Sequence, residues 1–396
     1  MLAWPLRRAA AERVGLEAAA GRVLAQDIIA PEDVPPFARS RVDGYAVSAA
    51  DVNGASRLAP SRLQLAGAVA MGQAPPSRLL SGQAMDIPTG GALPPGADGV
   101  VMIEDTAADG DSVRVFDGAG CTLNYTQAGA DVRAGDALFE RGAVLGAAAL
   151  GLLAAAGVAA VDVYARPAVA VLLSGDELVA PGEALGRGQI RDVNRYALTA
   201  AIVSAGFAVE LFPALPDDRA VLAAALDRGL RQCDAVVISG GSSVGERDYT
   251  PGVVAGAGLP GVLVHGVLAK PGRPTLLAVI GDQPVIGLPG NPVSALVMWE
   301  ALGRPILLGM FAKRDETLPL RAVLDSAVDV DPRFEHRVAV RLRRGVDGLH
   351  AEPLLGTSAQ MHILAFADAI VVIPLGTSEV SAGSSVDAFP IAGPLR

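Results

Sequence analysis

This sequence predicts a multidomain protein that combines an α/β domain, built on a mostly parallel sheet, with mixed N-terminal domains and a C-terminal β domain. Its 396 residues exceed what one hydrophobic core usually holds, which favours several domains. Between residues 168 and 239 apolar runs alternate with helical patterns, as in βαβ units. From Leu318 onward apolar and polar residues alternate, for example from His336 to Leu342, which is typical of a separate β domain.

The N-terminal part divides at a pair of prolines. Leu6–Leu24 carries apolar residues at helical spacing and predicts a helix, which Pro35 and Pro36 would not allow to continue. From Ser61 to Phe139 the apolar runs are short and are separated by Gly, Pro and Asp, which predicts small β-structure. Residues 142–157 then return to a helical pattern. We therefore expect a domain boundary near residue 35.

The α/β region shows the clearest alternation of elements. We expect strands at 168–173, 208–212 and 234–239, and helices at 194–206 and 218–231. The first and last of these strands are apolar almost throughout, as expected when helices cover both faces of a parallel sheet.

Composition and charge argue against several function classes. Acidic residues outnumber basic residues by 42 to 32, and no run of Lys or Arg would follow a phosphate backbone, so nucleic acid is a poor candidate partner. The long apolar stretch Gly142–Ala160 is interrupted by glycines, and we expect no membrane span. Arg7 and Arg8 are followed by acidic residues and no apolar signal region, so we expect a cytoplasmic location.

The cysteines and histidines show no metal-ligand pattern. Cys121 and Cys233 are far apart and lack the spacing of a zinc site, so we expect buried, inert thiols. The histidines are also irregularly spaced, and we interpret them as non-metal residues. They are His265, His336, His350 and His362.

A glycine-rich segment, Ser239-Gly-Gly-Ser-Ser-Val-Gly-Glu-Arg-Asp, follows the predicted strand 234–239 and is a candidate phosphate-binding loop. Its glycines permit close approach of the backbone to an anion, and its serines add hydroxyl donors. The loop would lie at the carboxyl end of a parallel strand, where open α/β sheets place their ligands. An ordinary glycine-rich turn between a strand and a helix explains the same residues. The candidate ligand-binding residues are Ser239, Gly240, Gly241, Ser242, Ser243 and Gly245.

A second candidate segment, Leu288-Pro-Gly-Asn-Pro-Val-Ser, follows a short predicted strand at 284–287. Asn291 is an N-cap type of residue, and a helix at 292–302 would present its amide end to an anion. Plain helix capping is the alternative interpretation. Just upstream, Lys270-Pro-Gly-Arg-Pro places two cations on a backbone stiffened by proline. The candidate residues of the two segments are Pro289, Gly290, Asn291 and Ser294, with Lys270 and Arg273.

Acidic residues near a phosphate site predict Mg²⁺, which prefers one or two protein carboxylates together with phosphate oxygens and water. Asp248 is the best candidate by position because it closely follows the glycine loop, whereas Asp217 is expected at a helix N-cap, where it would only cap. Any one of these carboxylates is also explained as a turn or surface residue. The candidates are Asp43, Asp131, Asp176, Glu177, Asp217, Asp218 and Asp248.

Taken in order along nearly the whole chain, these motifs resemble those of the MoeA family, which includes the E domain of gephyrin. The agreement in order is far more specific than any single motif. The matching segments are Pro36-Phe-Ala-Arg-Ser-Arg-Val-Asp-Gly-Tyr-Ala-Val, Pro88-Thr-Gly-Gly, Ser174-Gly-Asp-Glu-Leu, Asp192-Val-Asn, Ser239-Gly-Gly-Ser-Ser-Val-Gly-Glu-Arg-Asp, Lys270-Pro-Gly-Arg-Pro, Leu288-Pro-Gly-Asn-Pro-Val-Ser, Phe334-Glu-His-Arg and Ala367-Asp-Ala-Ile-Val-Val-Ile-Pro.

The resemblance implies an elongated homodimer of four-domain subunits, with an active cleft shared between the subunits. We expect a MogA-like α/β domain that binds the pterin, and a C-terminal β-barrel-like domain. The expected domains are an elongated helical and linker domain at 1–35 with 128–165, a small β-rich domain at 36–127, the α/β domain at 166–312 and the C-terminal domain at 318–396.

The activity that the resemblance implies is insertion of molybdate into adenylylated molybdopterin with release of AMP, assisted by Mg²⁺. The catalytic residues would be Asp176, Glu177, Asp217, Asp248 and Lys270, and Glu177, Asp217 and Asp248 among them would hold the metal. The molybdate residues would be Lys270, Arg273, Ser294, Arg337 and Ser358, and Asp43 and Asp131 would line the opposite side of the cleft. An adenylyltransferase is a candidate partner.

Several positions depart from the family pattern. Asn124-Tyr-Thr-Gln stands where a basic Asn-x-Arg stretch is expected, and Ala359 and Gln360 replace a serine and a nearby arginine. Ala38 and Ser174 also differ from the usual residues, and Arg273 replaces a lysine. These departures leave open a non-catalytic carrier that binds the pterin or the cofactor. An adenylyltransferase would need only the α/β domain, so the matched N-terminal signature and the Arg337 region argue against it.

Overall fold

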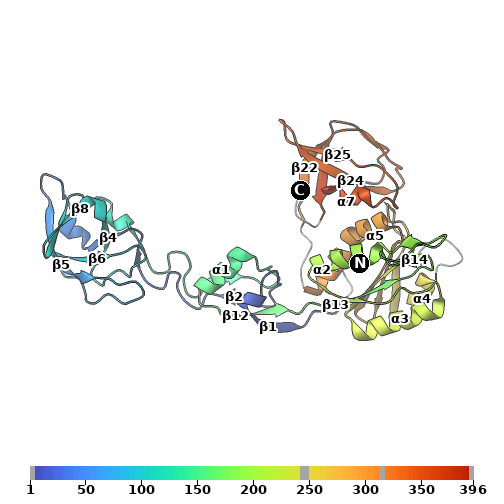
Figure 1. Ribbon diagram of the computed structural model, residues 1–396, viewed down its shortest axis with the longest axis horizontal. Coiled ribbons are helices and arrows are strands. Elements are labelled where there is room, and N and C mark those ends of the chain that lie inside the picture. Colours follow the sequence, from blue (N-terminus) through green and yellow to red (C-terminus); the bar gives the residue numbers. More distant parts are fainter. Residues whose placement is uncertain (1–4, 241–248, 312–316, 392–396) are drawn as a thin grey trace. The chain divides into compact units, whose positions relative to one another are not determined.

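The computed structural model describes residues 5–240, 249–311 and 317–391 (Figure 1). The chain divides into two compact units, one formed by Met1–Glu12 with Tyr164–Arg396 and the other by Arg13–Val163. Five predicted site residues lie outside the described residues, and they are Gly241, Ser242, Ser243, Gly245 and Asp248.

The described residues of the Arg13–Val163 unit form a mixed six-stranded sheet in the order β7-β4-β6-β5-β9-β8. Neighbouring strands are antiparallel except β5 and β6, which are parallel. The prediction of small β-structure is confirmed, although the sheet begins before Ser61. Its strands are β4 (Gly44–Val47), β5 (Ser61–Ala68), β6 (Gln83–Ile87), β7 (Gly99–Met102), β8 (Thr106–Asp109) and β9 (Ser112–Val115).

The rest of this unit packs around helix α1 (Ala147–Ala155), which confirms the helical pattern at 142–157. Leu153 of α1 is fully buried in a cluster with Leu24, Leu145 and Val163. Short elements complete the unit, namely β2 (Ile28–Ile29), β3 (Arg39–Ser40), β10 (Tyr125–Thr126) and β11 (Ala137–Phe139), with the 3-10 turns η2 (Ala49–Val52), η3 (Ile103–Asp105) and η4 (Cys121–Leu123).

The predicted helix at Leu6–Leu24 is wrong. The segment contains the strand β1 (Ala11–Gly15) and one 3-10 turn, η1 (Leu16–Ala18). Strand β1 pairs with β12 (Ala160–Tyr164), which lies about 150 positions later. A distant strand partner therefore overrides the local helical spacing, which is a weak preference by comparison.

The α/β domain is built on a six-stranded sheet in the order β16-β13-β17-β21-β20-β18. The first four strands are parallel, which confirms the predicted strands and the mostly parallel sheet. Strand β20 runs antiparallel to both of its neighbours, β21 and β18. The strands are β13 (Ala168–Leu173), β16 (Ala208–Leu211), β17 (Ala235–Ser239), β18 (Pro260–His265), β20 (Leu276–Ile280) and β21 (Gln283–Leu288).

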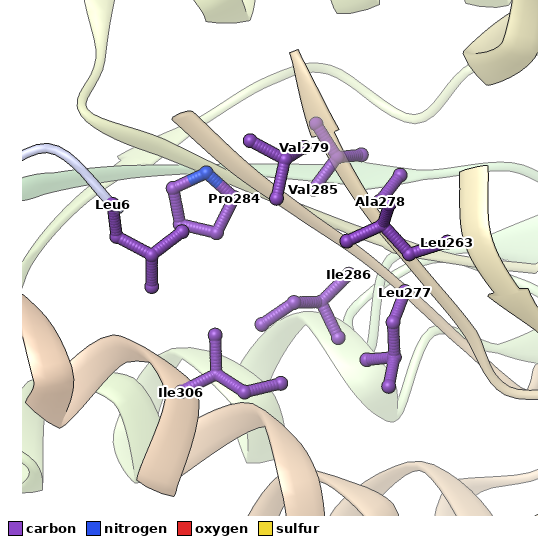
Figure 2. Close-up of a pocket in the computed structure, with 9 residues that line it drawn as sticks. All are labelled: Leu6, Leu263, Leu277, Ala278, Val279, Pro284, Val285, Ile286 and Ile306. Atoms are coloured by element: carbon purple, nitrogen blue, oxygen red, sulfur yellow. The ribbon is translucent and has the colours of Figure 1, made fainter. Parts of the chain in front are cut away.

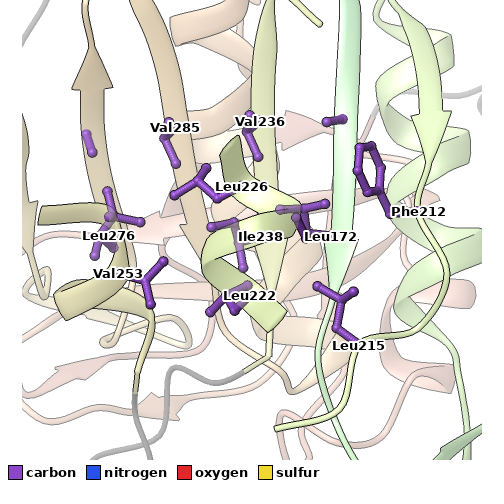
Figure 3. Close-up of a cluster of buried hydrophobic side chains, with 14 of the residues drawn as sticks. Leu172, Phe212, Leu215, Leu222, Leu226, Val236, Ile238, Val253, Leu276 and Val285 are labelled. Carbon is purple, nitrogen blue, oxygen red and sulfur yellow. The ribbon is translucent and has the colours of Figure 1, made fainter. Parts of the chain in front are cut away.

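Helices cover both faces of this sheet. On one face, Leu222 and Leu226 of α3 pack against Val236 and Ile238 of β17 (Figure 3). The alternating residues of the strands face α2 and α5, which pack against each other on the opposite face (Figure 1). The helices are α2 (Asn194–Ser204), α3 (Arg219–Gln232), α4 (Thr250–Gly256), α5 (Pro292–Met298), the π-helical turn η5 (Trp299–Gly303), α6 (Arg304–Leu308) and the 3-10 turn η6 (Gly309–Phe311).

The helical run Pro292–Phe311 is, among the described residues, the one segment long and apolar enough to cross a membrane by length and composition. Its most apolar window is 61% buried inside the protein, as for a core helix of a soluble domain.

The C-terminal residues form a closed barrel in the order β24-β25-β22-β28-β26, with β26 pairing back onto β24. The expected β-barrel-like domain is therefore confirmed. Its core contains Leu324, Val340, Ala351 and Val371. The elements are β22 (Leu320–Leu324), β23 (Val328–Asp329), β24 (Glu335–Arg344), β25 (Leu349–Pro353), α7 (His362–Ala365), β26 (Ala369–Ile373), β27 (Glu379–Val380) and β28 (Ser385–Pro390).

Two short strand pairs extend the α/β domain. Strand β14 (Leu178–Val179) pairs with β15 (Ile190–Arg191) beyond the carboxyl edge of the sheet. Strand β19 (Ala269–Lys270) pairs in parallel with the start of β24, so it joins the α/β domain to the barrel. The described residues thus form separate hydrophobic clusters in each folded region, while the domain boundaries predicted from the sequence stay predictions.

A small apolar cavity lies where the N-terminal segment meets the sheet (Figure 2). Leu6 and Ile306 of α6 close it against β20 and β21, and its volume is about 20 Å³. The backbone N–H of Arg7 donates to the carbonyl of Asp282 at 2.8 Å, so the N-terminal segment is held to the domain. Because its lining side chains are all apolar and it is barely large enough for one water, this cavity is a packing void and no ligand site.

Candidate functional site

The carboxyl edge of the α/β sheet brings two predicted turns together. Gly240 follows β17 with φ +97°, and a Cβ atom there would lie 2.1 Å from the carbonyl oxygen of Ser174. Only glycine fits such a close backbone approach. A Cβ atom on Gly290 would lie 3.6 Å from the Cα atom of Gly240. The turn after β17 and the turn after β21 are therefore neighbours, as the position of Ser239 and Pro289 at strand ends predicted.

Two predicted carboxylates lie beside these turns. The Ser174 hydroxyl donates to Asp217 Oδ1 at 2.6 Å, and the Asp217 backbone N–H donates to Asp176 Oδ1 at 3.2 Å. The backbone N–H of Ser174 donates to the carbonyl of Ser239 at 3.1 Å, which connects this acidic pair to the glycine turn. The structure thus brings Asp176, Asp217, Ser239 and Gly240 to one edge.

The predicted metal set is only partly assembled among the described residues. Of the predicted metal residues, Asp217 lies at this edge beside Asp176, and Asp248 lies outside the described residues. The carboxylate of Glu177 folds back over Gly175, where a Cβ atom would lie 2.8 Å from Glu177 Oε2. Within residues 5–240, 249–311 and 317–391, no group of three or more His, Cys, Asp or Glu could hold a metal.

The prediction that Asp217 caps a helix is wrong by one residue. Helix α3 begins at Arg219, and its N-cap is Asp218, which has extended backbone geometry. Asp218 Oδ1 accepts from the backbone N–H groups of Ala220 and Val221 at 2.8 and 2.9 Å. Asp217 is consequently not needed for capping, and its carboxylate is available for the site.

Asn291 occupies the N-cap position of α5, as predicted, but its side chain makes no capping hydrogen bond, so plain helix capping does not explain this residue. Instead, Asn291 Nδ2 donates to Ser358 Oγ at 3.0 Å. The backbone N–H of Val293 donates to the carbonyl of Ser358 at 3.1 Å. The start of α5 is therefore joined to a loop of the barrel.

Next to this junction an open pocket of about 350 Å³ lies between α5, β19 and the barrel. Three predicted molybdate residues line it, namely Lys270, Arg337 and Ser358, although they are far apart in the sequence. His336 and Thr357 add polar groups. Asp329 adds a carboxylate, and the remaining lining is mostly aliphatic. A low-polarity wall strengthens the attraction between the two cations and an anion.

Each cation of the pocket is held by a carboxylate. Arg337 Nη2 pairs with Glu335 Oε1 at 2.7 Å, whereas Arg337 Nε is buried and makes no hydrogen bond within the described part of the chain. Lys270 Nζ lies 3.1 Å from Asp331 Oδ2 and 4.4 Å from the centre of the Phe334 ring. Hydrogen bonds from Arg333, and then from Lys270, lower the pKa of Asp331 well below its ordinary value. Asp331 is therefore ionised and fixes the Lys270 side chain.

The other two predicted molybdate residues do not line the pocket. Arg273 is exposed, with its guanidinium carbon 5.9 Å from the centre of the Phe334 ring. Ser294 is only 5% exposed in the first turn of α5. Both are near neighbours of the pocket in the chain, but the structure places neither at its surface.

The two predicted residues across the cleft, Asp43 and Asp131, belong to the Arg13–Val163 unit. Asp43 Oδ1 accepts from the Thr89 backbone N–H at 2.7 Å, and this bond lowers the pKa of the Asp43 carboxyl. Asp131 is exposed. Their place across a shared cleft stays a prediction.

Two residues of the carboxyl edge were missed as site residues. Ser174 directly follows the predicted strand 168–173, so the same carboxyl-end argument that selected Ser239 could have selected it. Asn194 begins α2 and donates through Nδ2 to Ser239 Oγ at 2.9 Å and to the carbonyl of Gly290 at 2.8 Å. Its presence in the motif Asp192-Val-Asn, which matches the family pattern, was the sequence signal that could have identified it.

The thiols are as expected, since Cys121 and Cys233 are both buried and burial raises their pKa values. One histidine has a structural role. His350 Nδ1 and Nε2 lie 2.8 Å from Asp325 Oδ1 and Asp347 Oδ1 respectively, at one end of the β24–β25 hairpin.

This histidine predicts a pH dependence of barrel stability. Hydrogen bonds with Asp347 and then Asp325 raise the pKa of His350 above its ordinary 6.5. Because its pKa is raised in the folded state, protonated His350 contributes its full stabilisation of the fold below about pH 6.5. That contribution is lost as the pH rises through the folded-state pKa. We expect the melting temperature to fall across this range in the wild type and to fall less in His350→Gln. Differential scanning calorimetry at a series of pH values measures the melting temperature of both proteins. An equal change of melting temperature with pH in the two proteins would contradict the prediction.

Comparison with known proteins identifies the chain's relatives. The family model for the MoeA N-terminal region (domain I and II) matches residues 2–157, that for a probable molybdopterin binding domain matches 170–309, and that for the MoeA C-terminal region (domain IV) matches 321–391. Molybdopterin molybdenumtransferase 2 of Mycobacterium tuberculosis is 34% identical over 386 residues, covering 96% of this chain and 94% of that protein. Molybdopterin molybdenumtransferase of Haemophilus influenzae is 37% identical over 297 residues, covering 75% and 72%.

Solved structures show the same relationship. A molybdopterin biosynthesis MoeA protein from Pyrococcus horikoshii superposes with a TM-score of 0.84 at 26% identity, covering 98% of this chain and 96% of that one. Another Pyrococcus structure with the same description has a TM-score of 0.83 at 35% identity, covering 98% and 95%.

Proposed function

Because this chain belongs to the MoeA family, we propose that it is a molybdopterin molybdenumtransferase, which inserts molybdate into adenylylated molybdopterin and releases AMP. The observation that carries the proposal is the pocket between α5 and the barrel, where Lys270, Arg337 and Ser358 converge. Asn291 connects this pocket to the turn after β21. One ligand could therefore span from the phosphate edge of the sheet to the pocket.

At the phosphate end, the turns after β17 and β21 hold the terminal phosphate and the adenylyl group. Gly240 and Gly290 allow the backbone to approach phosphate oxygens without a Cβ atom in the way. Gly241, Ser242, Ser243 and Gly245 extend this proposal along the same loop. The overall chain is acidic, but a local cluster of backbone amides binds an anion regardless of the total charge.

Asp176 and Asp217 are the proposed Mg²⁺ ligands, because both lie beside these turns, where the Asp217 backbone N–H donates to Asp176 Oδ1, and the substrate supplies phosphate oxygens. Bound there, the metal would neutralise phosphate charge while the pyrophosphate bond is cleaved. Ser174 orients the Asp217 carboxylate by donating to it. Glu177 and Asp248 remain proposed as further ligands.

At the molybdate end, Lys270 and Arg337 provide two positive charges for a dianion. The Arg337 guanidinium and the Ser358 hydroxyl, which both line the pocket, are the proposed donors for molybdate oxygens. Asp331 and Glu335 hold the two cations in place from behind. Arg273 and Ser294 remain proposed molybdate residues, although neither lines the pocket.

The assembly proposed for this enzyme is a homodimer, located in the cytoplasm, in which Asp43 and Asp131 of a second copy face the phosphate edge. An adenylyltransferase that supplies the adenylylated substrate is the proposed partner. Neither a membrane nor a nucleic acid has a role in this proposal.

The test is release of AMP. Purified protein incubated with adenylylated molybdopterin, Mg²⁺ and molybdate is expected to release AMP only when molybdate is present. Chromatographic measurement of AMP over time checks it, with an Asp217→Ala variant as the background. Release no faster than that background would disprove the insertase activity.

A carrier that binds the pterin without turnover is the second candidate, and the departures from the family pattern favour it. Asn124 Nδ2 donates to the carbonyl of Val100 at 2.9 Å, and Gln360 Oε1 accepts from the Thr357 N–H at 2.7 Å, so both amides are committed within the protein. A carrier would bind the pterin in a calorimeter and yet release no AMP in the assay above.

A further inference from the structure

One buried amide donates hydrogen bonds to both turns at the carboxyl edge of the sheet. Asn194 Nδ2 donates both to Ser239 Oγ, at 2.9 Å, and to the carbonyl of Gly290, at 2.8 Å. Ser239 Oγ in turn donates to the carbonyl of Pro289 at 3.1 Å. The side chain of Asn194 is only 9% exposed. It therefore bridges the turn after β17 and the turn after β21 from inside the domain.

The position of this amide is set by the start of α2. Asp192 accepts from the Arg195 backbone N–H at 3.0 Å and from Arg195 Nε at 3.2 Å. The Arg195 guanidinium also donates to the carbonyl of Phe212 at 2.9 Å, next to the end of β16. Because these bonds fix the first turn of α2, Asn194 cannot follow the two turns if they move.

Although it is buried, the Asn194 side chain contributes little to the free energy of folding. Asn194 Oδ1 is buried and accepts no hydrogen bond from the described residues. A buried acceptor without a partner costs stability, which offsets part of what the two donations contribute. The main effect of Asn194 is thus on the geometry of the turns.

We propose that Asn194 is a positioning residue of the phosphate end, which sets the separation between the Ser239–Gly240 turn and the Pro289–Gly290 turn. This inference rests on the proposed function, because it assigns both turns to one phosphate group. Gly240 is already in backbone contact with Ser174, so it has no room to adjust on that side. Without the amide, the carbonyl of Gly290 loses its donor, and the Ser239 Oγ bond to the Pro289 carbonyl alone holds the side chains of the two turns together. The backbone at Gly290 is then less precisely placed for a group that both turns bind.

The experiment compares binding and backbone protection in matched variants. Asn194→Asp keeps the volume of the side chain but cannot donate at neutral pH. Asn194→Ala removes both the volume and the N–H donors. We expect each variant to raise the dissociation constant of AMP, measured by calorimetry with Mg²⁺, by about tenfold. This is the size of effect expected from the loss of one hydrogen bond. Hydrogen exchange at the Gly290 and Asn291 amides is expected to become faster in both variants.

Gln283→Ala is the control, because Gln283 makes the same kind of bridge at the opposite end of β21. Its Nε2 donates to the carbonyls of Leu230 and Cys233 at 2.9 and 2.6 Å, and it is 7% exposed. We expect this variant to melt earlier and yet to bind AMP within about twofold of the wild type. An equal loss of binding in Gln283→Ala would overturn the proposal, since general loosening would then explain both.

Wild-type affinity in Asn194→Asp would also overturn the positioning role. The proposed function fails separately, if the wild type binds AMP but releases none from adenylylated molybdopterin. In that case the affinity and exchange measurements still decide the role of Asn194. Failure of the wild type to bind AMP at all would overturn both.

Discussion

Replacement of Arg337 with alanine is expected to lower molybdate-dependent AMP release by about a hundredfold and to raise the molybdate concentration that gives half the maximal rate. Arg337 lines the pocket, and its Nε–H is buried without a partner among the described residues. The variant would also leave the Glu335 carboxylate unpaired beside the dianion. Initial rates of AMP release across a series of molybdate concentrations measure both effects.

Arg341→Ala is the matched control for this prediction. Arg341 lies on the same strand and the same face, but it pairs with Glu352 at 3.8 Å and does not line the pocket. Its replacement is expected to leave the molybdate response unchanged. Arg337→Lys keeps the charge without the planar fork and is expected to fall between the wild type and Arg337→Ala. An unchanged molybdate response in Arg337→Ala would remove the pocket from the mechanism.

Replacement of Asp217 with asparagine is expected to reduce AMP release at saturating molybdate by on the order of a hundredfold and to raise the Mg²⁺ requirement. The change removes one negative charge from the acidic pair with Asp176 while keeping the shape of the side chain. Its amide oxygen still accepts from the Ser174 hydroxyl, so the fold is expected to stay intact. Rates measured against Mg²⁺ concentration, with a thermal melt of each variant, check this prediction.

The neighbouring residue provides the control. Asp218→Ala removes the cap of α3 and is expected to reduce the free energy of unfolding by about 1 kcal/mol. Well below its melting temperature, this variant is expected to release AMP at the wild-type rate. The assignment of roles fails if Asp218→Ala loses activity and Asp217→Asn keeps it.

The α/β domain was the part of the fold most open to prediction from sequence. Strands 168–173 and 234–239 are continuous apolar runs, because helices cover both faces of a parallel sheet. Once those strands are known, the carboxyl-end rule places Ser239 and Pro289 at a common edge. The phosphate end could therefore be predicted from local patterns and one general rule of topology.

The N-terminal helix failed for a reason that lies in tertiary structure. The apolar residues of Leu6–Leu24 are spaced as on one helical face, but they pack in different clusters. Leu6 packs at the α/β sheet, whereas Leu24 is buried in the cluster around α1. Strand pairing with β12 is a long-range contact, and no local spacing reveals it.

The roles of Asp217 and Asp218 show how one residue can decide a site. Both are adjacent carboxylates before a helix, and capping preferences do not distinguish them. Only the backbone conformation at Asp218, which turns its side chain toward the first N–H groups of α3, leaves Asp217 to meet Ser174.

By itself the sequence determined the family, through the order of its motifs along the chain. It also determined the alternating elements of the α/β domain, because their patterns depend on residues close together in the chain. Tertiary structure alone decided which of the proposed molybdate residues line one pocket. Lys270, Arg337 and Ser358 meet because β19 pairs with β24 and because Ser358 bonds to the start of α5. It also decided the bridge made by Asn194. The two acceptors, Ser239 at the end of β17 and Gly290 after β21, come within reach of one amide only when the sheet has formed.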